Sequence, residues 1–580
     1  MLISFLFIFS GLLNPAVPID PLIQKELKNK NTADILCVLK SPYEKIKDLT
    51  EHFDTKEQKG IFVYTHLQEY ANKSQASLIS YLKAHHYAFN SFFIVNAIRI
   101  PQADQKLIEY LSILHEVHRI EFNSPYQLIR PVDPVSLHDL ETRSPLAIEW
   151  GILRIKADSV WALGFRGQGI TVGSEDTGVE LHPAIKNNYR GFGATLDHNY
   201  NWHDAIHVLN PLNKDANQNE YNNPCGLDTI APCDDDNHGT HTTGIMAASD
   251  FQIGVAPEAK WIGCRCMERG WGMLTTYIEC FQWFLAPTDT SNKNPDPRKA
   301  PHVINNSWGC PSQEGCNPSN FRTMEVVVNT LKAAGIFVTV SAGNSGALGC
   351  GSISDPAAIF ESSFTVGATN VQDTIAGFSS RGPVSVDGSN RLKPNISAPG
   401  VSVKSTIKNG QYASFSGTSM SGPHVAASVA LILSAFPQLA GKVDLLENIL
   451  ESSADHKFTQ LSCGRDSLTT IPNNIFGYGR LNVLKAYRLA NIFMTTPVQI
   501  QKNDLIKIYP NPAHDLIIID AHQAHILSVE LINVQGGIVK NERKIDQSQY
   551  ALETNGLTAG YYFYKINTDQ GQKTGKLIIQ

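Results

Sequence analysis

The chain lacks an excess of charge of either sign. Its 48 Lys and Arg residues nearly balance 54 Asp and Glu residues, for a formal net charge of −6, and no basic stripe or tail stands out. Because nucleic acids and other polyanions bind clustered positive charge, we expect no nucleic acid among the partners of this protein.

No apolar run is long enough to cross a bilayer, which takes about 20 residues. Residues 1–13 form a shorter apolar stretch, and the Pro-containing segment after it is typical of a secretory signal. The stretch lacks a basic start, since no Lys or Arg precedes Lys25, and it lacks a clean A-x-A cleavage site. We predict a signal peptide over residues 1–19, no transmembrane segment, and a secreted or cell-surface protein. A frayed apolar N-terminus is the alternative.

No C-x-x-C pair occurs among the ten cysteines, which argues against a zinc site, and so many cysteines suit an exported protein. Two pairs bracket short polar loops that a disulfide would stiffen, namely Cys225 with Cys233 and Cys310 with Cys316. Cys264 and Cys266 lie on one face of an expected strand, and either could reach Cys280. The sequence does not fix the pairing.

The length of 580 residues, with 42% of them hydrophobic, allows about three or four domains with large cores. Residues 20–143 have the pattern of a small α+β domain followed by an exposed, Pro-containing linker. Its expected strands are Ala33–Leu39, Phe92–Ile100 and Val117–Ile120, and its expected helices are Lys56–Lys83 and Asp104–Ser112.

Residues 144–495 differ, because apolar strands without alternation recur between helices. The expected strands are Ile170–Val172, Trp261–Cys264, Val303–Asn305, Ile336–Val340 and Ser363–Val366, and the helices include Thr323–Ala334 and Gly422–Phe436. Buried strands separated by helices predict an α/β fold with a parallel sheet covered on both faces. In such folds, functional sites collect at the carboxyl ends of the strands.

After a polar linker at residues 496–504, residues 505–580 contain short strands with turn signals between them. The strands are expected at Ile506–Tyr509, Leu516–Asp520, Ile526–Asn533, Gly537–Lys540, Gly560–Thr568 and Lys573–Ile579. Several alternate apolar with polar residues, which predicts a small antiparallel β-sandwich.

Four short segments of the middle region place chemistry-bearing residues at strand and helix ends. They are D-T-G with Asp176, H-G-T-H with His238, S-A-G-N with Asn344, and G-T-S-M-S-G-P with Ser419. Each has an ordinary explanation by itself. Asp176 and Asn344 are typical turn residues, His238 could be structural, and the segment around Ser419 could simply begin a helix.

Together the four residues match what acyl transfer requires. A serine hydroxyl is a weak nucleophile until an imidazole accepts its proton. The imidazole needs a buried carboxylate that fixes its tautomer. The negative oxygen of the tetrahedral intermediate needs donors, which an Asn amide and the Ser N–H would supply.

The motif segments resemble those of subtilisin-like serine proteases, with the order Asp, His, Ser of that family. The resemblance covers about residues 146–491 and implies a subtilisin-like fold and the hydrolysis of peptide bonds in proteins and peptides. It implies that Ser419 is the nucleophile, that His238 is the general base and acid, and that Asp176 orients His238. It also implies that Asn344 is the oxyanion donor.

The resemblance further implies a substrate-binding surface. Ser307, Trp308 and Gly309 would form a strand that pairs with an extended peptide, although an ordinary edge strand is the alternative for Trp308. Ala342 and Gly343 would form a wall of the primary specificity pocket. Asp355 would lie near the base of that pocket and favour Lys or Arg, or it would serve as a turn residue before Pro356.

The segments around Cys310, Cys316 and Cys350 resemble the bacillopeptidase F branch of the family. His241 and His424 also lie in the motifs, and the resemblance implies structural roles for them. Family members carry an apolar residue where this chain has Glu175. Strand alternation turns Glu175 away from Asp176, so we expect a bystander that finds a polar partner or water.

We expect no cofactor for catalysis and assign no metal ligand. Three acidic residues, Asp234–Asp236, lie in an expected exposed loop where they would stay solvated. A structural calcium ion at this loop is the alternative.

With a subtilisin-like core, residues 20–123 are similar to the ferredoxin-like inhibitory prodomain of that family. The resemblance implies that the chain's own prodomain is a partner, which occupies the cleft until autocleavage within Asn123–Arg143. The segments Ile508–Pro512 and Gly556–Tyr562 resemble the C-terminal sorting domain of type IX secretion cargo, which implies the type IX machinery as a partner. A carbohydrate- or substrate-binding β-module is the competing interpretation.

The leading hypothesis is a secreted serine endopeptidase. A catalytically inactive surface-binding homologue is the alternative from another functional class. A sedolisin-like peptidase would carry Glu in place of the base and Asp in place of the oxyanion Asn, and neither replacement occurs here.

Overall fold

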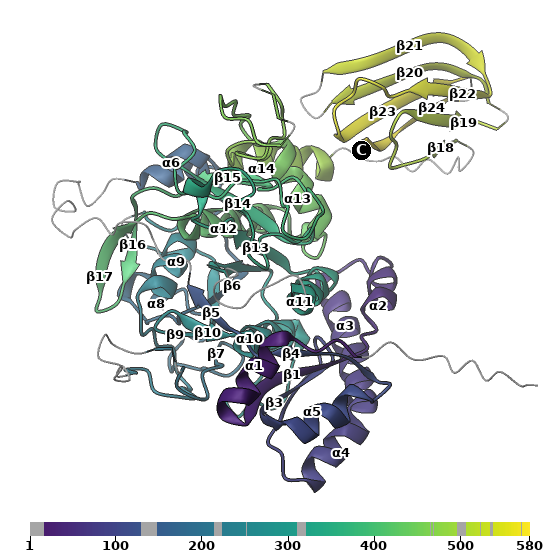
Figure 1. Ribbon diagram of the computed structural model, residues 1–580. Coiled ribbons are helices and arrows are strands. Elements are labelled where there is room, and N and C mark those ends of the chain that lie inside the picture. Colours follow the sequence, from purple (N-terminus) through teal and green to yellow (C-terminus); the bar gives the residue numbers. More distant parts are fainter. Residues whose placement is uncertain are drawn as a thin grey trace, which may run out of the picture.

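Three regions follow one another along the chain in the computed structural model (Figure 1). The structure describes residues 17–128, 148–210, 212–213, 223–250, 252–309, 321–464, 466–467, 469–495, 506–522, 524–533, 537–569 and 571–579. Most of the predicted signal peptide, the predicted Cys310–Cys316 loop and the linker at residues 496–504 lie outside these described residues.

The N-terminal region is built on a four-stranded antiparallel sheet with the order β2-β3-β1-β4. The strands are β1 (Thr32–Leu39), β2 (Asn90–Phe92), β3 (Ala97–Asp104) and β4 (Val117–Phe122). The helices are α1 (Pro21–Lys30), α2 (Tyr43–Thr50), α3 (Lys56–Ser74), α4 (Ala76–Ala84) and α5 (Gln105–Ser112). The predicted α+β class is confirmed, although the sequence patterns missed α1 and α2.

Two predicted elements of this region are divided by a buried polar contact. Gln75 separates α3 from α4, and its side-chain Nε2 donates to Asn96 Oδ1 at 3.0 Å. Asn96 adopts a left-handed φ of 51° and turns the predicted strand Phe92–Ile100 into the hairpin β2–β3. Hydrophobic patterning carries no signal for such a contact, because the two residues meet only in the folded chain.

Seven parallel strands form the central sheet, with the order β15-β14-β13-β11-β6-β8-β7. They are β6 (Thr171–Asp176), β7 (Trp202–Asp204), β8 (Lys260–Arg265), β11 (Val303–Asn306), β13 (Phe337–Ser341), β14 (Phe364–Thr369) and β15 (Ile396–Pro399). The predicted parallel sheet is confirmed. The edge strands β7 and β15 were missed because neither has a run of apolar residues, β7 reading W-H-D and β15 reading I-S-A-P.

Helices cover both faces of this sheet, and each face has its own apolar core. One core holds residues of α7 (Ala157–Trp161), α9 (His238–Ala247), α12 (Thr418–Ala435), α13 (Val443–Ser452) and α14 (Val483–Thr495). The other core holds residues of α10 (Leu274–Leu285) and α11 (Phe321–Ala333). Val63 and Leu67 of α3 belong to this second core, so the N-terminal region packs on the α10–α11 face.

The helix that carries Ser419 begins earlier than the apolar pattern predicts. α12 starts at Thr418 instead of Gly422, and Pro423 lies inside it. Because proline has no N–H, the Ser419 carbonyl loses the donor that a helix normally supplies four residues later. The Ser307 hydroxyl donates to that carbonyl instead, at 3.4 Å.

A small antiparallel sheet joins the N-terminal region to the central one. β5 (Pro125–Leu128) lies between β12 (Trp308–Gly309) and β10 (Trp271–Met273), and β9 (Met267–Glu268) follows β10. The sequence patterns predict no strand at β5, because its partners are distant in sequence and a short strand has little local signal. The N-terminal region therefore contributes a strand to the surface of the central region.

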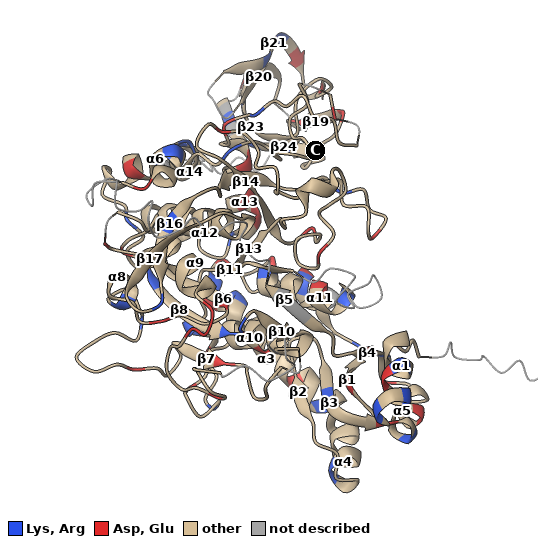
Figure 2. Ribbon diagram, turned by 60° about the vertical axis from the view of Figure 1, so that its left-hand side comes forward, with Lys and Arg blue, Asp and Glu red and all other residues tan. Residues whose placement is uncertain are grey.

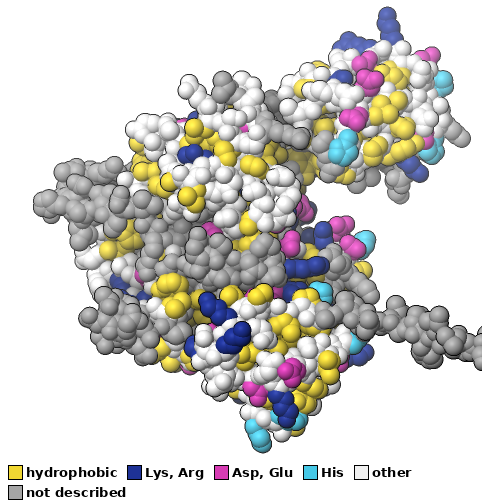
Figure 3. All heavy atoms as spheres, in the orientation of Figure 1, with side chains coloured by type: hydrophobic (Ala, Val, Ile, Leu, Met, Phe, Trp, Pro, Cys, Tyr) yellow, Lys and Arg dark blue, Asp and Glu magenta, His cyan; other side chains and the backbone are white. Residues whose placement is uncertain are grey.

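The C-terminal region consists of two antiparallel sheets around a separate apolar core, as predicted. One sheet holds β18 (Lys507–Tyr509), β19 (Leu516–Asp520) and β22 (Gln549–Glu553), and the other holds β20 (Ile526–Asn533), β21 (Ile538–Gln547), β23 (Gly560–Thr568) and β24 (Gly571–Ile579). Tyr561 and Phe563 lie against Phe493 of α14, with ring centroids 5.3 and 5.6 Å apart. Figure 3 shows the region as a lobe that contacts the rest at one corner.

Charge is mixed over the described surface. Figure 2 shows Lys and Arg interspersed with Asp and Glu along all three regions. In the part of the chain that the structure describes, no helix combines the length and apolar character needed to cross a bilayer.

Candidate functional site

Asp176 and His238 form a buried hydrogen-bonded pair at one end of the central sheet. Asp176 is the last residue of β6, and His238 is the first residue of α9. His238 Nδ1 lies 2.7 Å from Asp176 Oδ1 and 3.0 Å from Oδ2, and each side chain is 1% exposed. A carboxylate at Nδ1 favours the tautomer with its proton there, which makes Nε2 the acceptor.

Burial and charge act in opposite directions on His238. Burial lowers the pKa of the imidazole, but the charge and hydrogen bond of Asp176 raise it, and the net pKa lies above the ordinary value of 6.5. The Thr177 N–H and the Thr242 hydroxyl donate to Asp176 at 2.8 and 3.2 Å. These two donors hold the carboxylate in the orientation that the imidazole needs.

Asp234 ties the strand end to the helix start. It accepts from the Thr177 hydroxyl at 2.9 Å, and from the N–H and hydroxyl of Thr240 at 3.0 and 2.6 Å. Thr177 follows Asp176, and Thr240 lies in the first turn of α9. Asp234 therefore fixes the relative position of Asp176 and His238, although burial raises its pKa to about 6.

Ser419 is the second residue of α12 and is fully buried. In the first turn of a helix the backbone N–H groups have no partner within the helix, and the dipole favours negative charge. α12 packs against both α9 and β6, so the segments that carry Ser419, His238 and Asp176 converge. His238 Nε2 is buried and makes no hydrogen bond with any described residue.

Thr418 anchors Asn344 beside the start of α12. The Asn344 Oδ1 accepts from the N–H and the hydroxyl of Thr418, at 3.0 Å each. With its oxygen held by these two donors, the amide directs its Nδ2 donor group away from Thr418. The Ser341 hydroxyl adds a 3.0 Å hydrogen bond to the Thr418 carbonyl.

The proposed substrate strand is occupied by a segment of the chain itself. β12 pairs with β5 antiparallel, with Trp308 opposite Leu128 and Gly309 opposite Gln127. Ser307, which precedes β12, is buried and contacts the Ser419 carbonyl through its hydroxyl. The Trp308 ring packs in the core, with its centroid 4.1 Å from that of Tyr277, while its backbone pairs with β5.

Ala342 and Gly343 follow directly from β13. Ala342 is buried, and the Gly343 N–H donates to the Thr418 hydroxyl at 3.2 Å. Gly343 has a φ of 101°, a conformation that residues with a side chain rarely adopt. These two residues therefore lie next to Asn344 and the N-terminus of α12.

The other motif histidines are buried and bonded to backbone carbonyls. His241 Nε2 lies 3.1 Å from the Ala413 carbonyl, and burial lowers its pKa to about 3. His424 Nδ1 lies 2.7 Å from the Met420 carbonyl, and burial lowers its pKa to about 4. Both imidazoles are neutral in the folded protein and contribute packing.

Glu175 lies on the face of β6 opposite Asp176. It pairs in register with Cys264, which is bonded to Cys280 of α10. Both carboxyl oxygens are buried and have no hydrogen-bond partner among the described residues, so of the expected polar partner or water, only water stays a prediction. Burial, followed by the charge of Asp176, raises the Glu175 pKa well above its ordinary value, so the group is protonated instead.

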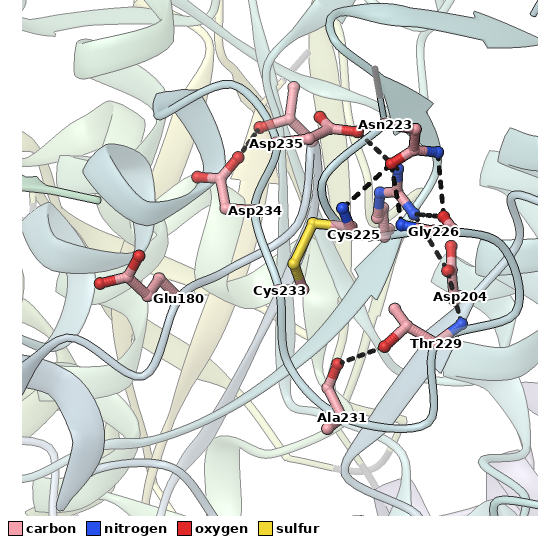
Figure 4. The surroundings of a disulfide bond; sticks show 12 residues. Glu180, Asp204, Asn223, Cys225, Gly226, Thr229, Ala231, Cys233, Asp234 and Asp235 are labelled. Atoms are coloured by element: carbon pink, nitrogen blue, oxygen red, sulfur yellow. Dashed lines mark hydrogen bonds and ion pairs between the residues drawn. A yellow bond between two sulfur atoms is a disulfide. The ribbon is translucent and has the colours of Figure 1, made fainter. Parts of the chain in front are cut away.

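The acidic loop before His238 is engaged in protein contacts. Figure 4 shows Asp234 and Asp235 beside the Cys225–Cys233 disulfide. Asp235 Oδ2 pairs with the buried Arg265 at 2.5 Å, and its Oδ1 accepts from the Arg269 N–H at 2.9 Å. Asp234 and Asp235 are thus not solvated as predicted, because they bind α9 and Arg265. The calcium ion at this loop stays a prediction.

Three disulfides occur in the described part of the chain: Cys225–Cys233, Cys264–Cys280 and Cys350–Cys463. The first was predicted, and the second resolves the choice between Cys264 and Cys266 for Cys280. Cys266 and Cys37 are buried free thiols.

Sequence reasoning missed several residues that shape the site. β10 supplies the second edge that pairs with β5, and Leu128 N–H donates to the Gly270 carbonyl at 2.8 Å. Thr418 and Asp234 hold Asn344 and His238 in place. Thr418 could have been predicted, because it lies in the same motif as Ser419. No sequence pattern predicts the strand β10.

Comparison with known proteins gives two family matches. Residues 167–479 match the model described as "Subtilase family", and residues 507–580 match the "Secretion system C-terminal sorting domain". Bacillopeptidase F of Bacillus subtilis is 35% identical over 482 residues, which is 80% of this chain and 31% of that protein. This chain thus spans about a third of the length of that relative.

Two shorter relatives align with the central region. The alkaline protease of Alkalihalobacillus alcalophilus is 31% identical over 335 residues, which is 56% of this chain and 71% of that protein. Subtilisin Savinase of Lederbergia lenta is 32% identical over 290 residues, which is 49% of this chain and 84% of that protein. The chain therefore belongs to the subtilase family and carries a secretion system C-terminal sorting domain.

Proposed function

We propose that the chain is a secreted serine endopeptidase that hydrolyses peptide bonds in proteins and peptides. Ser419 is the nucleophile, His238 the general base and acid, and Asp176 the residue that orients His238. Asn344 is the oxyanion donor. The observation that carries the proposal is the buried 2.7 Å pair of Asp176 and His238, which leaves Nε2 as an acceptor beside the helix of Ser419.

The reaction follows from these positions. Ser419 Oγ attacks the peptide carbonyl carbon while its proton passes to His238 Nε2, and the Asp176 carboxylate stabilises the imidazolium. The Asn344 amide and the Ser419 N–H stabilise the negative oxygen. The imidazolium then protonates the leaving amine, and water releases the acyl group from Ser419 by the reverse sequence of proton transfers.

The position of β5 supports recognition of an extended peptide. Strand addition supplies affinity through backbone hydrogen bonds, which do not depend on the side chains. β5 lies antiparallel to both β10 and β12, and β12 begins one residue after Ser307, whose hydroxyl contacts the Ser419 carbonyl. A substrate would take the place of β5 between the same two edges.

Contacts of the N-terminal region support its assignment as an inhibitory prodomain within residues 20–143. Gln282 Oε1 of α10 accepts from the N–H groups of Phe93 and Ile94 at 2.7 and 3.2 Å. Asn123 Oδ1 and the Ser124 carbonyl accept from the first two N–H groups of α10 at 3.1 and 3.0 Å. The prodomain thus caps a helix of the peptidase domain, residues 144–495, and reaches the cleft directly afterwards.

Labelling with a fluorophosphonate probe tests the nucleophile. Wild-type protein freed of its prodomain is expected to be labelled, and Ser419→Ala is expected to lose both labelling and peptidase activity, by about 10⁴-fold or more. Ser434→Ala, at the other end of α12, is the matched control and retains both. Wild-type protein that folds but is not labelled would favour the inactive surface-binding homologue.

N-terminal sequencing tests autocleavage. We expect a cut on the C-terminal side of Leu128, because β5 pairs with β12 up to that residue. Residues 129–143 of the predicted interval lie outside the described residues. Ser419→Ala is expected to stay uncut, and a mutant processed like wild type would show that another protease makes the cut.

The last region supports export by the type IX machinery, with secretion or cell-surface attachment as the outcome. Residues 507–580 match a sorting domain and have their own core. A periplasmic reporter fused to residues 496–580 is expected to leave the cell. Retention of that reporter in the periplasm would favour a binding module.

A further inference from the structure

Asp355, whose carboxylate has an unpartnered oxygen, lies beside Gly343. The Oδ1 atom of Asp355 is shut off from solvent and has no hydrogen-bond partner among the described residues. A Cβ atom added to Gly343 would lie 3.6 Å from Asp355 Oδ2. Since Gly343 has no side chain, nothing of this residue separates its backbone from the carboxylate.

This carboxylate is close to the residues that would surround a bound substrate. Gly343 precedes Asn344, and its N–H donates to the hydroxyl of Thr418, the neighbour of Ser419. The Ser307 hydroxyl lies 3.3 Å from that of Ser341, and these two hydroxyls donate to the Ser419 and Thr418 carbonyls. The ends of β11 and β13 therefore lie against the start of α12. A substrate side chain adjacent to the attacked carbonyl would project between the Ser307–Gly309 and Ala342–Asn344 segments.

The alternative role of Asp355 as a turn residue does not use its side chain. The Asp355 carbonyl accepts from the Ile359 N–H at 3.3 Å, whereas no backbone N–H of the described residues donates to the carboxylate. A capping or turn-forming Asp would normally place its side chain on such a donor. The turn is therefore made by the backbone, and the carboxylate remains unexplained by it.

A carboxylate oxygen that is shut off from solvent without a partner is costly, and native structures contain few such atoms. Burial raises the Asp355 pKa to about 6, and no neighbouring Lys or Arg offsets that effect. A cation that entered from outside would regain the lost interaction. Ammonium and guanidinium groups form charge-assisted hydrogen bonds with carboxylates, and such bonds are strong when water is excluded.

We propose that Asp355 is a specificity-determining residue, and that the peptidase prefers substrates with Lys or Arg on the residue whose carbonyl Ser419 attacks. This inference rests on the proposed function. A basic side chain would reach Asp355 past Gly343 and pair with it. An apolar side chain of similar length would leave the carboxylate unpartnered, so it would be discriminated against.

Four peptide substrates that differ only at the residue before the cut test the proposal, with Arg, Lys, citrulline or Leu at that position. Citrulline has the shape of Arg without its charge. For the wild type, we expect kcat/KM to be about 100-fold higher with Arg than with citrulline. In Asp355→Asn this ratio is expected to fall to about threefold or less, while kcat/KM for Leu changes by less than about threefold.

The matched control is Glu361→Gln, which removes a negative charge from an exposed side chain that pairs with Arg391. It is expected to keep the wild-type ratio. If Asp355→Asn does not fold, the proposal is tested by the wild type alone, through the ratio of its kcat/KM values for the Arg and citrulline substrates.

Equal rates for Arg and citrulline in the wild type, or an unchanged ratio in Asp355→Asn, would overturn the proposal. Fluorophosphonate labelling of Ser419 in the same samples separates the two levels of inference. Labelled enzyme that hydrolyses the Leu substrate without a basic preference contradicts only the role of Asp355. Protein that is neither labelled nor active on any substrate contradicts the proposed function as well.

Discussion

Two neighbouring carboxyl groups at the end of β6 lie on opposite faces of the sheet and differ in their hydrogen bonding. On the α9 face, Asp176 receives hydrogen bonds from His238, Thr177 and Thr242. On the α10 face, Glu175 is equally buried but has no partner among the described residues. The comparison shows that burial alone does not make a carboxyl group useful for catalysis, since a charge needs donors that are already in place.

The α10 face belongs to an apolar core. Cys264 lies beside Glu175 in the sheet and forms a disulfide with Cys280. Such surroundings offer no solvation, so Glu175 keeps its proton, and its pKa is raised well above the ordinary value by burial and then by Asp176.

The largest effect is expected on the α9 face, from Asp176→Asn. Loss of the carboxylate removes the group that fixes the tautomer of His238, and kcat/KM is expected to fall by about 10⁴-fold. The imidazole must be neutral to accept a proton, so activity is lost as pH falls through its pKa, which Asp176 holds above 6.5. The acid limb of the pH profile should therefore move to lower pH in the variant. An unmoved limb would show that Asp176 does not control the titration of His238.

The next effect concerns stability on the α10 face. Replacing both Cys264 and Cys280 by Ala opens a disulfide with a sequence separation of 16. Loss of this constraint on the unfolded chain is expected to lower the free energy of unfolding by about 3 kcal/mol. Chemical denaturation of the Ser419→Ala background, which prevents self-digestion, provides the measurement. A change in the activity of the native protein without a change in stability would contradict a purely structural role.

Glu175→Gln is expected to have a smaller effect that depends on pH. Unfolding exposes Glu175 and returns its pKa to the ordinary value, so the unfolded chain loses a proton that the folded chain retains. Wild-type stability should therefore fall relative to Glu175→Gln as pH rises from about the ordinary value of 4.5, by about 1 kcal/mol or more at neutral pH. Denaturation midpoints of both proteins at several pH values measure this difference.

Activity provides the companion test for Glu175. Glu175→Ala is expected to keep kcat/KM within about tenfold of wild type, because the side chain points away from His238. A loss as deep as that of Ser419→Ala would show that the two faces are not independent.

The smallest effect is expected from Cys266→Ala. The Cys266 thiol is buried, donates only a 3.5 Å contact to the Asp176 carbonyl, and has a pKa raised well above its ordinary value by burial. A protonated, inaccessible thiol reacts slowly, so iodoacetamide should leave it unmodified in the native protein. The variant should retain kcat/KM within about threefold. Rapid inactivation of wild type by the reagent would indicate that this face opens to solvent.

Much of the fold was predictable because strongly apolar segments decide it. β8, β11 and β13 carry no alternation, and their buried, parallel arrangement followed from that pattern. Elements that depend on distant partners were not predictable. β5 is a strand because it pairs with β10 and β12. The helix pair α3–α4 is divided at Gln75, whose side chain contacts Asn96.

The candidate site shows the same division. Asp176, His238, Asn344 and Ser419 were predicted because acyl transfer demands those residue types and the chain carries them in short motifs. The structure places Asp176 against His238, and it places Asn344 beside the helix of Ser419. Asp234 was predicted to lie in a solvated loop, but it accepts a hydrogen bond from the first turn of α9. A sequence does not show which carboxylate will contact a helix N-terminus.

The hydrogen bond from Ser307 to the Ser419 carbonyl has a consequence for how this protein can vary. Pro423 has no N–H to donate to this carbonyl, and the Ser307 hydroxyl, next to β12, donates to it instead. The two positions are therefore linked as a pair, and Pro423→Ala should make the Ser307 hydroxyl dispensable. Through this hydrogen bond, a shift of the strand edge at Ser307 would also shift the backbone that carries the Ser419 hydroxyl.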